Sequence, residues 1–217
     1  MALTVCVTGN IGSGKTTLTK LLAERFVNAC YISEPHDINP FLPLYLKDKP
    51  RWGFTAQLRY FWDYARVYQQ TVSQRSYDFH FVDAGIWTNR LVYAAYLRQE
   101  QIISDDEFTF YGELCDSIQQ ARSIPDPQAF IFIKASPQTC WDRMHRRGWQ
   151  YQVSAIDLAY IEALHDMISA MQQTVSASGV PTLELSSEHL DFTTPAGQDE
   201  ALAQVQPFLD LHQGTHE

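Results

Sequence analysis

The chain has 217 residues, of which 45% are hydrophobic and 19% charged, so it is long enough to bury one sizeable core. Its formal net charge of −9 argues against a general nucleic-acid or membrane-surface binder, because such proteins present an excess of Lys and Arg to phosphate groups. A small anionic ligand would therefore need a local positive site.

No apolar run reaches membrane-spanning length. The four cysteines lack the CxxC spacing of zinc and redox sites, which suits buried thiols in a reducing compartment. We expect a cytoplasmic protein that binds neither nucleic acid nor membrane. A single domain is expected over residues 1–212, followed by a frayed tail at 213–217.

Five β-rich apolar runs alternate with helical patterns along the chain. They cover residues 3–8, 29–33, 78–83, 129–134 and 180–185. Strands that alternate with helices predict an α/β fold with a parallel sheet. Ser136 before Pro137 predicts a helix start, and Ser154 with Asp157 predicts a capping box that opens a helix running to about residue 176.

A phosphate site is predicted between the first strand and the first helix. The segment Gly9-Asn10-Ile11-Gly12-Ser13-Gly14-Lys15-Thr16-Thr17 contains the GxxxxGK[ST] pattern of a P-loop. Its glycines let backbone N–H groups surround phosphate oxygens, and the start of the helix adds partial positive charge. Lys15 would reach the outer phosphates of ATP, and Thr16 would hold Mg²⁺.

Two carboxylates follow predicted strands, Glu34 after the second and Asp83 at the end of the third. The carboxyl ends of the strands form the ligand crevice in an open parallel sheet. Asp83 closes an apolar run, the Walker B pattern for a carboxylate that supports the metal. The alternative is that Asp83 serves only as a turn residue or a helix cap.

Two further segments suggest a ligand. Residues 41–68 are dense in aromatic side chains, most of them expected in the core, but a few could sandwich a planar base whose edge is bound by Gln57. Arg143, Arg146 and Arg147 share one helix face, and they could close over a triphosphate as a lid. A solvated basic face is the alternative.

The sequence resembles the deoxynucleoside kinase family, most closely its bacterial deoxyadenosine/deoxyguanosine kinase branch. The resemblance extends to about residue 176. Its first motifs are the P-loop, Glu34-Pro35, and the stretch 39–57 with Arg51-Trp52, Phe54 and Gln57. Farther along the chain they are the run 83–94, the strand-to-helix connection 133–137, Arg143, Arg147-Gly148 and residues 160–164. The Arg-Trp and Gln motif is more specific than the P-loop, which indicates only a nucleotide.

The resemblance implies a P-loop kinase fold with a five-stranded parallel sheet, helices on both faces and an arginine-bearing lid, commonly assembled as a homodimer. It implies that Glu34 is the general base for the 5′-hydroxyl of the acceptor, and that Asp83 supports Mg²⁺. It also implies that Gln57 bonds the base, Tyr93 stacks on it, and Trp52 lines the pocket. Gln152 stands at the position of a sugar-contacting glutamate. Arg143 and Arg147 belong to the lid, and they are expected to be catalytic together with Lys15 of the P-loop.

The chain departs from the family pattern on the acceptor side. Ala84 replaces the arginine of an Asp/Glu-Arg-Ser motif, and Trp149 replaces a lid arginine. An arginine and an aspartate that shape base choice fall on Tyr64 and Asn89. The motifs that bind the phosphate donor therefore match the family pattern better than the motifs that bind the acceptor.

Three functions remain open from the sequence. The first is an ATP-dependent kinase of the 5′-hydroxyl of a deoxynucleoside, with a purine base as one option and a place in nucleotide salvage. The second is a nucleoside monophosphate kinase similar to thymidylate kinases, although the Asp-Arg that those enzymes use at the third strand is missing. The third is a nucleotide-binding protein with impaired kinase chemistry.

Overall fold

The computed structural model describes residues 2–35 and 39–212. Its centre is a five-stranded sheet of parallel strands in the order β2-β3-β1-β4-β5. The strands are β1 (Leu3–Gly9), β2 (Ala29–Ile32), β3 (Phe79–Asp83), β4 (Ala129–Lys134) and β5 (Thr182–Ser186). All five predicted strands are confirmed. The strand order reverses at β1, so the P-loop leaves the sheet at the crevice where such folds bind ligands.

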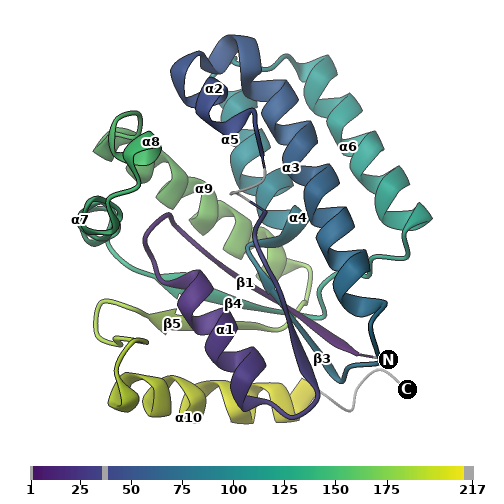
Figure 1. Ribbon diagram of the computed structural model, residues 1–217, viewed down its shortest axis with the longest axis vertical. Helices are drawn as coiled ribbons and strands as arrows, with labels where there is room; N and C mark the ends of the chain where they lie inside the picture. Colours follow the sequence, from purple (N-terminus) through teal and green to yellow (C-terminus); the bar gives the residue numbers. More distant parts are fainter. Residues whose placement is uncertain (1, 36–38, 213–217) are drawn as a thin grey trace.

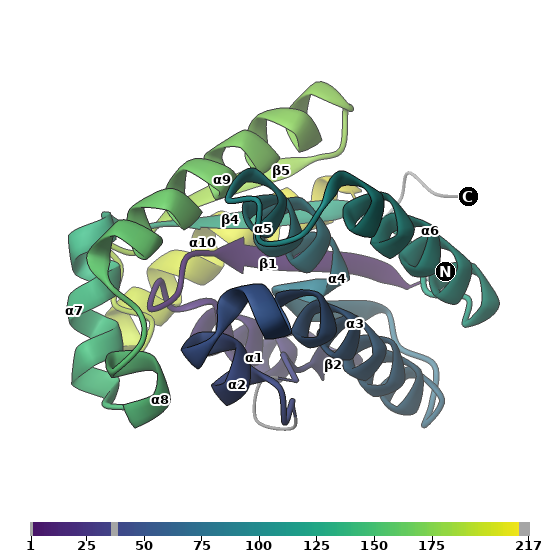
Figure 2. The same ribbon diagram turned by 90° about the horizontal axis from the view of Figure 1, so that it is seen from above.

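Helices cover both faces of the sheet, as Figures 1 and 2 show. They are α1 (Lys15–Arg25), α2 (Leu42–Lys47), α3 (Lys49–Val72), α4 (Gly85–Thr88), the π-helix η2 (Asn89–Ala94), α5 (Ala95–Gln99), α6 (Asp105–Ala121), α7 (Pro137–Arg147), α8 (Gln150–Val153), α9 (Leu158–Ala177) and α10 (Pro195–His212). The helices α1 and α10 pack on one face, and α3, α9 and the α4–α6 segment pack on the other.

The alternation of side chains along a strand divides the core between these two faces. In β1, Val5 and Val7 pack with α1 and α10, whereas Cys6 packs with α9 and its neighbours. Every residue of β1 is buried, as expected for the central strand of a parallel sheet that is covered on both sides.

One predicted helix start is confirmed and the other is wrong. The Ser136 side chain accepts a hydrogen bond from the Thr139 N–H at 3.1 Å and caps α7. The expected capping box of Ser154 and Asp157 does not form. Residues 150–153 make the separate short helix α8, which Ser154 ends, and Asp157 alone caps α9 by accepting from the Tyr160 N–H at 2.8 Å.

No helix within residues 2–35 and 39–212 is long and apolar enough to cross a bilayer. All four cysteines are buried and carry free thiols. The predicted tail at 213–217 lies outside the described residues.

Candidate active site

The P-loop connects the end of β1 to the start of α1. Gly12 and Gly14 have φ values of 80° and 99°, which glycine adopts without the steric cost of a side chain. A Cβ atom on Gly12 would lie 2.3 Å from the carbonyl oxygen of Cys140, so the loop also packs directly against the backbone of α7. Lys15 is buried and its Nζ donates to the Asn10 carbonyl at 3.2 Å. The loop is thus shaped for phosphate before any ligand binds.

Asp83 lies beside the P-loop at the end of β3. Its Oδ2 accepts a hydrogen bond from Thr16 Oγ1 at 2.6 Å and from the Tyr31 hydroxyl at 3.2 Å. Burial, followed by the charge of Asp83, raises the pKa of Tyr31, so this phenol keeps its proton and remains a donor. The predicted pair of Thr16 and Asp83 is therefore brought together.

The same pair fits a magnesium ion. Asp83 is fully buried, and its Oδ1 has no hydrogen-bond partner among the described residues. Hydroxyl and carboxylate oxygens are the ligands that Mg²⁺ prefers. Within the described part of the chain no group of three or more His, Cys, Asp or Glu could hold a metal, so the ion would take most of its ligands from the triphosphate and water.

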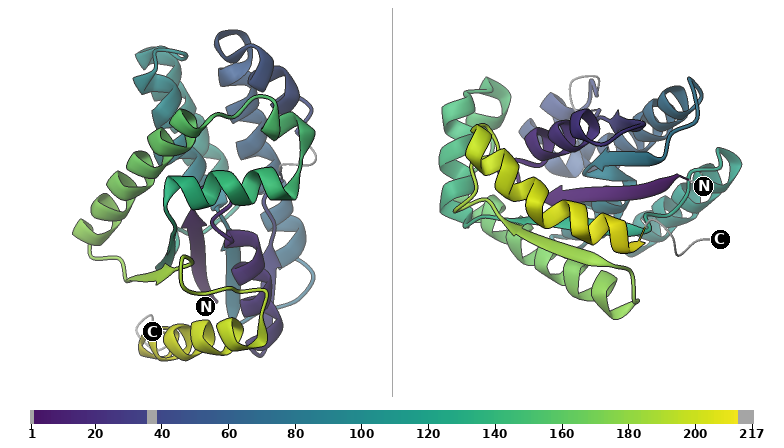
Figure 3. Two further views of the ribbon diagram at one scale, coloured as in Figure 1. Left: turned by 90° about the vertical axis from the view of Figure 1, so that its left-hand side faces the viewer. Right: turned by 90° about the horizontal axis from the view of Figure 1, so that it is seen from below.

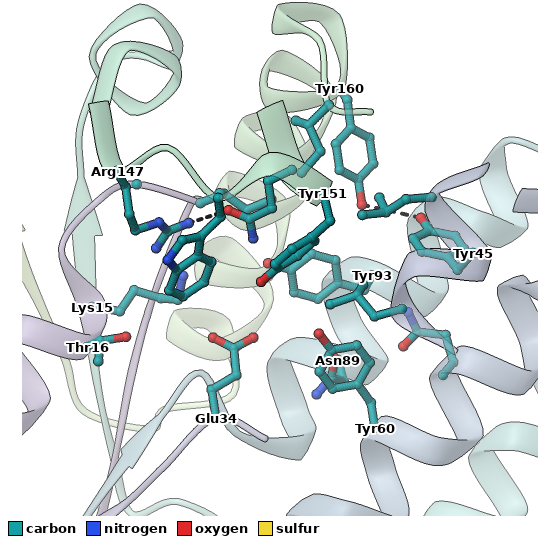
Figure 4. Close-up of a pocket in the computed structure, with 18 of the residues that line it drawn as sticks. Lys15, Thr16, Glu34, Tyr45, Tyr60, Asn89, Tyr93, Arg147, Tyr151 and Tyr160 are labelled. Carbon is teal, nitrogen blue, oxygen red and sulfur yellow. Dashed lines mark hydrogen bonds between the residues drawn. The ribbon is translucent and has the colours of Figure 1, made fainter. Parts of the chain in front are cut away.

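A first cavity of about 410 Å³ extends from the P-loop toward α3 and α9. Its P-loop end is lined by Ile11, Gly12, Lys15, Thr16, Thr17 and Lys20. Its tyrosine end is lined by Leu42, Tyr45, Leu46, Gln57, Tyr60, Asn89, Tyr93, Tyr151, Ile156 and Tyr160. Glu34, Arg147, Trp149 and Gln152 line it as well. In Figure 4 the Glu34 carboxylate points into the space between Lys15 and Thr16 on one side and the tyrosines on the other.

The lining of the tyrosine end carries no charged side chain among the described residues. Burial and then the charge of Glu34 raise the pKa of both Tyr60 and Tyr93, so their phenols stay neutral. Gln57 is only 4% exposed, and its Oε1 has no hydrogen-bond partner among the described residues. A buried amide oxygen without a partner is costly, so this end is suited to a neutral, flat ligand with hydrogen-bond donors at its edge.

A second cavity of about 690 Å³ lies on the other side of the P-loop. It is lined by Gly12, Ser13, Gly14, Thr17, Arg143, Arg146, Arg147 and residues 187–193. The three arginines of α7 thus share one cavity, as their spacing predicts. Arg143 donates to the Ser187 Oγ at 3.0 Å and to the Ser187 carbonyl at 2.7 Å. The left view of Figure 3 shows the segment α7–α8 arching over the carboxyl end of β1.

Arg147 is the one arginine of α7 that lines both cavities. Its guanidinium lies over the Trp149 ring, 3.8 Å from the centroid, and donates to Gln152 Oε1 at 2.5 Å. The Trp149 ring also stacks on Tyr151 at 5.9 Å. Arg147 is therefore held by Trp149 and Gln152 at the boundary of the two cavities, beside the P-loop.

The structure places Trp52 outside the cavity lining, contrary to the prediction that it lines the pocket. Its ring stacks on Phe41 at 5.7 Å and carries the Arg51 guanidinium at 4.5 Å. The reason is helical geometry, because Trp52 and Gln57 lie about 140° apart around α3. The other predicted acceptor residues, Gln57, Tyr93 and Gln152, do line the cavity.

Arg59 and Arg66 of α3 both pair with a buried carboxylate, away from the position of the arginine missing at Ala84. Arg59 Nε lies 2.6 Å and an Arg66 terminal nitrogen 3.4 Å from the carboxylate of the fully buried Asp63. Neither arginine lines the first cavity.

Two lining residues were given no binding role of their own from the sequence. Asn89 stood only as a departure from the family pattern, and Tyr60 only as one aromatic residue of the stretch 41–68. Helical spacing could have placed both at the ligand, because Tyr60 lies three residues after Gln57 and Asn89 four before Tyr93. Residues 187–193 of the second cavity carry no motif, and only the fold brings them to the P-loop.

A family profile and the similar proteins described below all point to the same protein family. The family profile described as "Deoxynucleoside kinase" matches residues 5–210. A probable deoxycytidine kinase of fowlpox virus is 24% identical over 94% of this chain and 87% of its own length. A deoxyadenosine kinase of Lactobacillus acidophilus is 25% identical over 94% and 95%, and a deoxyadenosine/deoxycytidine kinase of Bacillus subtilis is 26% identical over 86% and 83%.

A solved structure confirms the fold. The deoxyadenosine kinase from M. mycoides, with products dCMP and a flexible dCDP bound, superimposes with a TM-score of 0.77 at 15% identity. The match covers 94% of this chain and all of that one, so the sheet and its helices are those of the P-loop kinase fold.

Proposed function

The chain belongs to the deoxynucleoside kinase family, and we propose that it transfers the γ-phosphate of ATP to the 5′-hydroxyl of a deoxynucleoside. The observation that carries this proposal is the neutral tyrosine end, which adjoins Glu34 and the P-loop within one cavity. A neutral nucleoside fits such a lining, whereas a nucleoside monophosphate would need further arginines on its own phosphate, and Arg147 is the one arginine among the described lining residues. Lys15, Lys20 and Arg147 all lie toward the P-loop.

The side chains divide the chemistry among them. Glu34 would accept the proton of the 5′-hydroxyl while that oxygen attacks the γ-phosphorus. Lys15, Arg143 and Arg147 would stabilise the charge on the phosphoryl oxygens, and the P-loop backbone would hold the phosphates. When bound, Mg²⁺ would supply positive charge to the phosphates, with Thr16 and Asp83 as the residues that would hold it.

The base would be bound by two amides, Gln57 and Asn89, and by stacking on Tyr93. An amide presents both a donor and an acceptor, so the pair does not by itself favour amino or keto bases. The names of the relatives also vary, from deoxyadenosine to deoxycytidine and deoxyguanosine kinases. A purine preference therefore stays a prediction.

Assembly and location also remain predictions. The exposed aromatic side chains of Trp62 on α3 and Phe110 on α6 support the expected homodimer through helices. The buried free thiols support the expected reducing, cytoplasmic compartment.

The test is an assay of ADP formation with a panel of deoxynucleosides and nucleoside monophosphates, with Lys15→Ala as the control. We expect the wild-type protein to phosphorylate at least one deoxynucleoside in a Mg²⁺-dependent reaction. ADP formation with monophosphates alone would favour the monophosphate kinase. Tight ATP binding without any turnover would favour the nucleotide-binding protein.

A further inference from the structure

The chain leaves β3 through an unusual backbone turn. Ala84 has φ 61° and ψ −47°, a conformation that only glycine adopts without steric cost. These angles are close to those of the rare γ-turn, in which a carbonyl bonds to the N–H two residues later. Ala84 is buried, so surrounding contacts must hold the turn in place.

The hydroxyl of Tyr64 bridges this turn. It donates to the Asp83 carbonyl at 2.5 Å and accepts from the Gly85 N–H at 3.2 Å. It therefore stands between the two groups that would bond directly in a γ-turn. Tyr64 is only 2% exposed, and burial, followed by the charges of Glu34 and Asp83, raises its pKa well above the ordinary value, so the phenol stays protonated.

The bridged turn joins the two ends of the active site. On one side is Asp83, whose carboxylate accepts a hydrogen bond from Thr16 of the P-loop. On the other side the chain enters α4 and then η2, whose Asn89 and Tyr93 line the tyrosine end. Moving this turn would shift the metal-supporting carboxylate and the base-binding residues together.

We infer that Tyr64 is a positioning residue, whose hydroxyl holds the Asp83–Gly85 turn and thereby sets Asp83 against Thr16 and η2 against the acceptor. Tyr64 lines neither cavity. The inference rests on the proposed function, because the role of Asp83 at the metal belongs to it. An ordinary core tyrosine would contribute through its ring alone, so removing only the hydroxyl separates the two roles.

The first test compares Tyr64→Phe with Tyr68→Phe. Tyr68 is a matched control because it lies on the same helix, is also buried, and bonds through its hydroxyl to His80 Nδ1 at 2.9 Å. We expect Tyr64→Phe to lower kcat about tenfold or more and to raise the Mg²⁺ concentration needed for half-maximal activity. Tyr68→Phe should lose similar stability in urea but keep kcat and Mg²⁺ dependence within about twofold. Equal kinetics for the two variants would overturn the inference.

The second test repeats Tyr64→Phe in an Ala84→Gly background. Glycine reaches positive φ without steric cost, so the turn should depend less on the hydroxyl. We expect the kcat loss caused by Tyr64→Phe to shrink to about threefold or less in that background. An equal loss in both backgrounds would refute the inference. If the Tyr64→Phe variant does not fold, we expect the double variant to fold and to phosphorylate the deoxynucleoside. A double variant that does not fold or has no activity would count against the inference. A wild-type protein inactive on every deoxynucleoside would instead contradict the proposed function.

Discussion

The two ends of the first cavity are built in different ways. The P-loop end comes from one continuous segment, and a phosphate bound there would be contacted mainly by backbone N–H groups. The tyrosine end is assembled from side chains of α2, α3, η2, α8 and α9, which meet only in the folded protein. A site built from backbone tolerates few changes, whereas a site built from separate side chains can change its ligand one residue at a time. The family departures at Asn89 and Trp149 accordingly fall on side chains that line the cavity outside the P-loop segment, whereas Tyr64 and Ala84 do not line it.

The largest effect is expected at the P-loop end. Lys15→Ala should lower kcat by about 10³-fold or more, because the ammonium group stabilises charge on the transferring phosphoryl group. The fold should persist, since the Lys15 side chain makes a single hydrogen bond, to the Asn10 carbonyl, among those found. Steady-state kinetics and circular dichroism check both points. Unchanged turnover would contradict the role of Lys15, and loss of secondary structure would show that it is structural.

A smaller loss is expected between the two ends. Glu34→Gln should lower kcat by about 10²- to 10⁴-fold while ATP affinity stays nearly unchanged, because a general base acts on the acceptor hydroxyl. Calorimetry with ATP and Mg²⁺ measures the affinity, and Asp83→Asn serves as the control expected to weaken it. If Glu34→Gln loses affinity as severely as Asp83→Asn, then Glu34 belongs to the metal site.

The lid should show coupled effects. Arg147→Ala and Trp149→Ala should each lower kcat about tenfold, and the double variant should be little worse than Arg147→Ala alone, because the Trp149 ring acts by holding the guanidinium. Trp149→Phe keeps an aromatic face and should restore most of the rate. Additive losses in the double variant would indicate that the two residues act separately.

The smallest effects distinguish Gln57 from Trp52 on α3. Gln57→Leu should raise the acceptor KM about tenfold with the KM for ATP unchanged, because the buried amide loses its bonds to the base. Trp52→Phe should change either KM by about twofold or less, since its ring stacks on Phe41 outside the cavity. The reverse ranking would place Trp52 at the base after all.

The sequence was sufficient for the features that depend on neighbouring residues. The five strands, the P-loop and the cap at Ser136 follow from local patterns, and the structure agrees with each. The capping box at Ser154 failed because a short helix, α8, occupies the preceding residues and shifts the start of α9 to Leu158. Local pattern alone does not show where one helix ends and the next begins.

The acceptor side could be predicted only in part. A motif match placed Trp52 in the pocket, but the turn of α3 directs it away from Gln57. The strained backbone at Ala84 and the Tyr64 bridge involve residues twenty positions apart, and a phenol that bonds a backbone turn leaves no periodic pattern. Such contacts depend on tertiary structure and become visible only when the chain is folded.

The contact of Gly12 with the Cys140 carbonyl has a mechanical consequence. Because α7 contacts the P-loop at Cys140, this contact is the expected pivot for any rotation of the helix. Arg143 and Arg147 lie about 4.5 Å and about 10.5 Å farther along the helix axis, so Arg147 sweeps the wider arc. Arg143 is also hydrogen-bonded to Ser187, whereas α7 ends directly after Arg147 at Gly148, which has φ 74°. A rotation of α7 about this contact would therefore displace Arg147, which lines both cavities, farther than Arg143, which lines only the second.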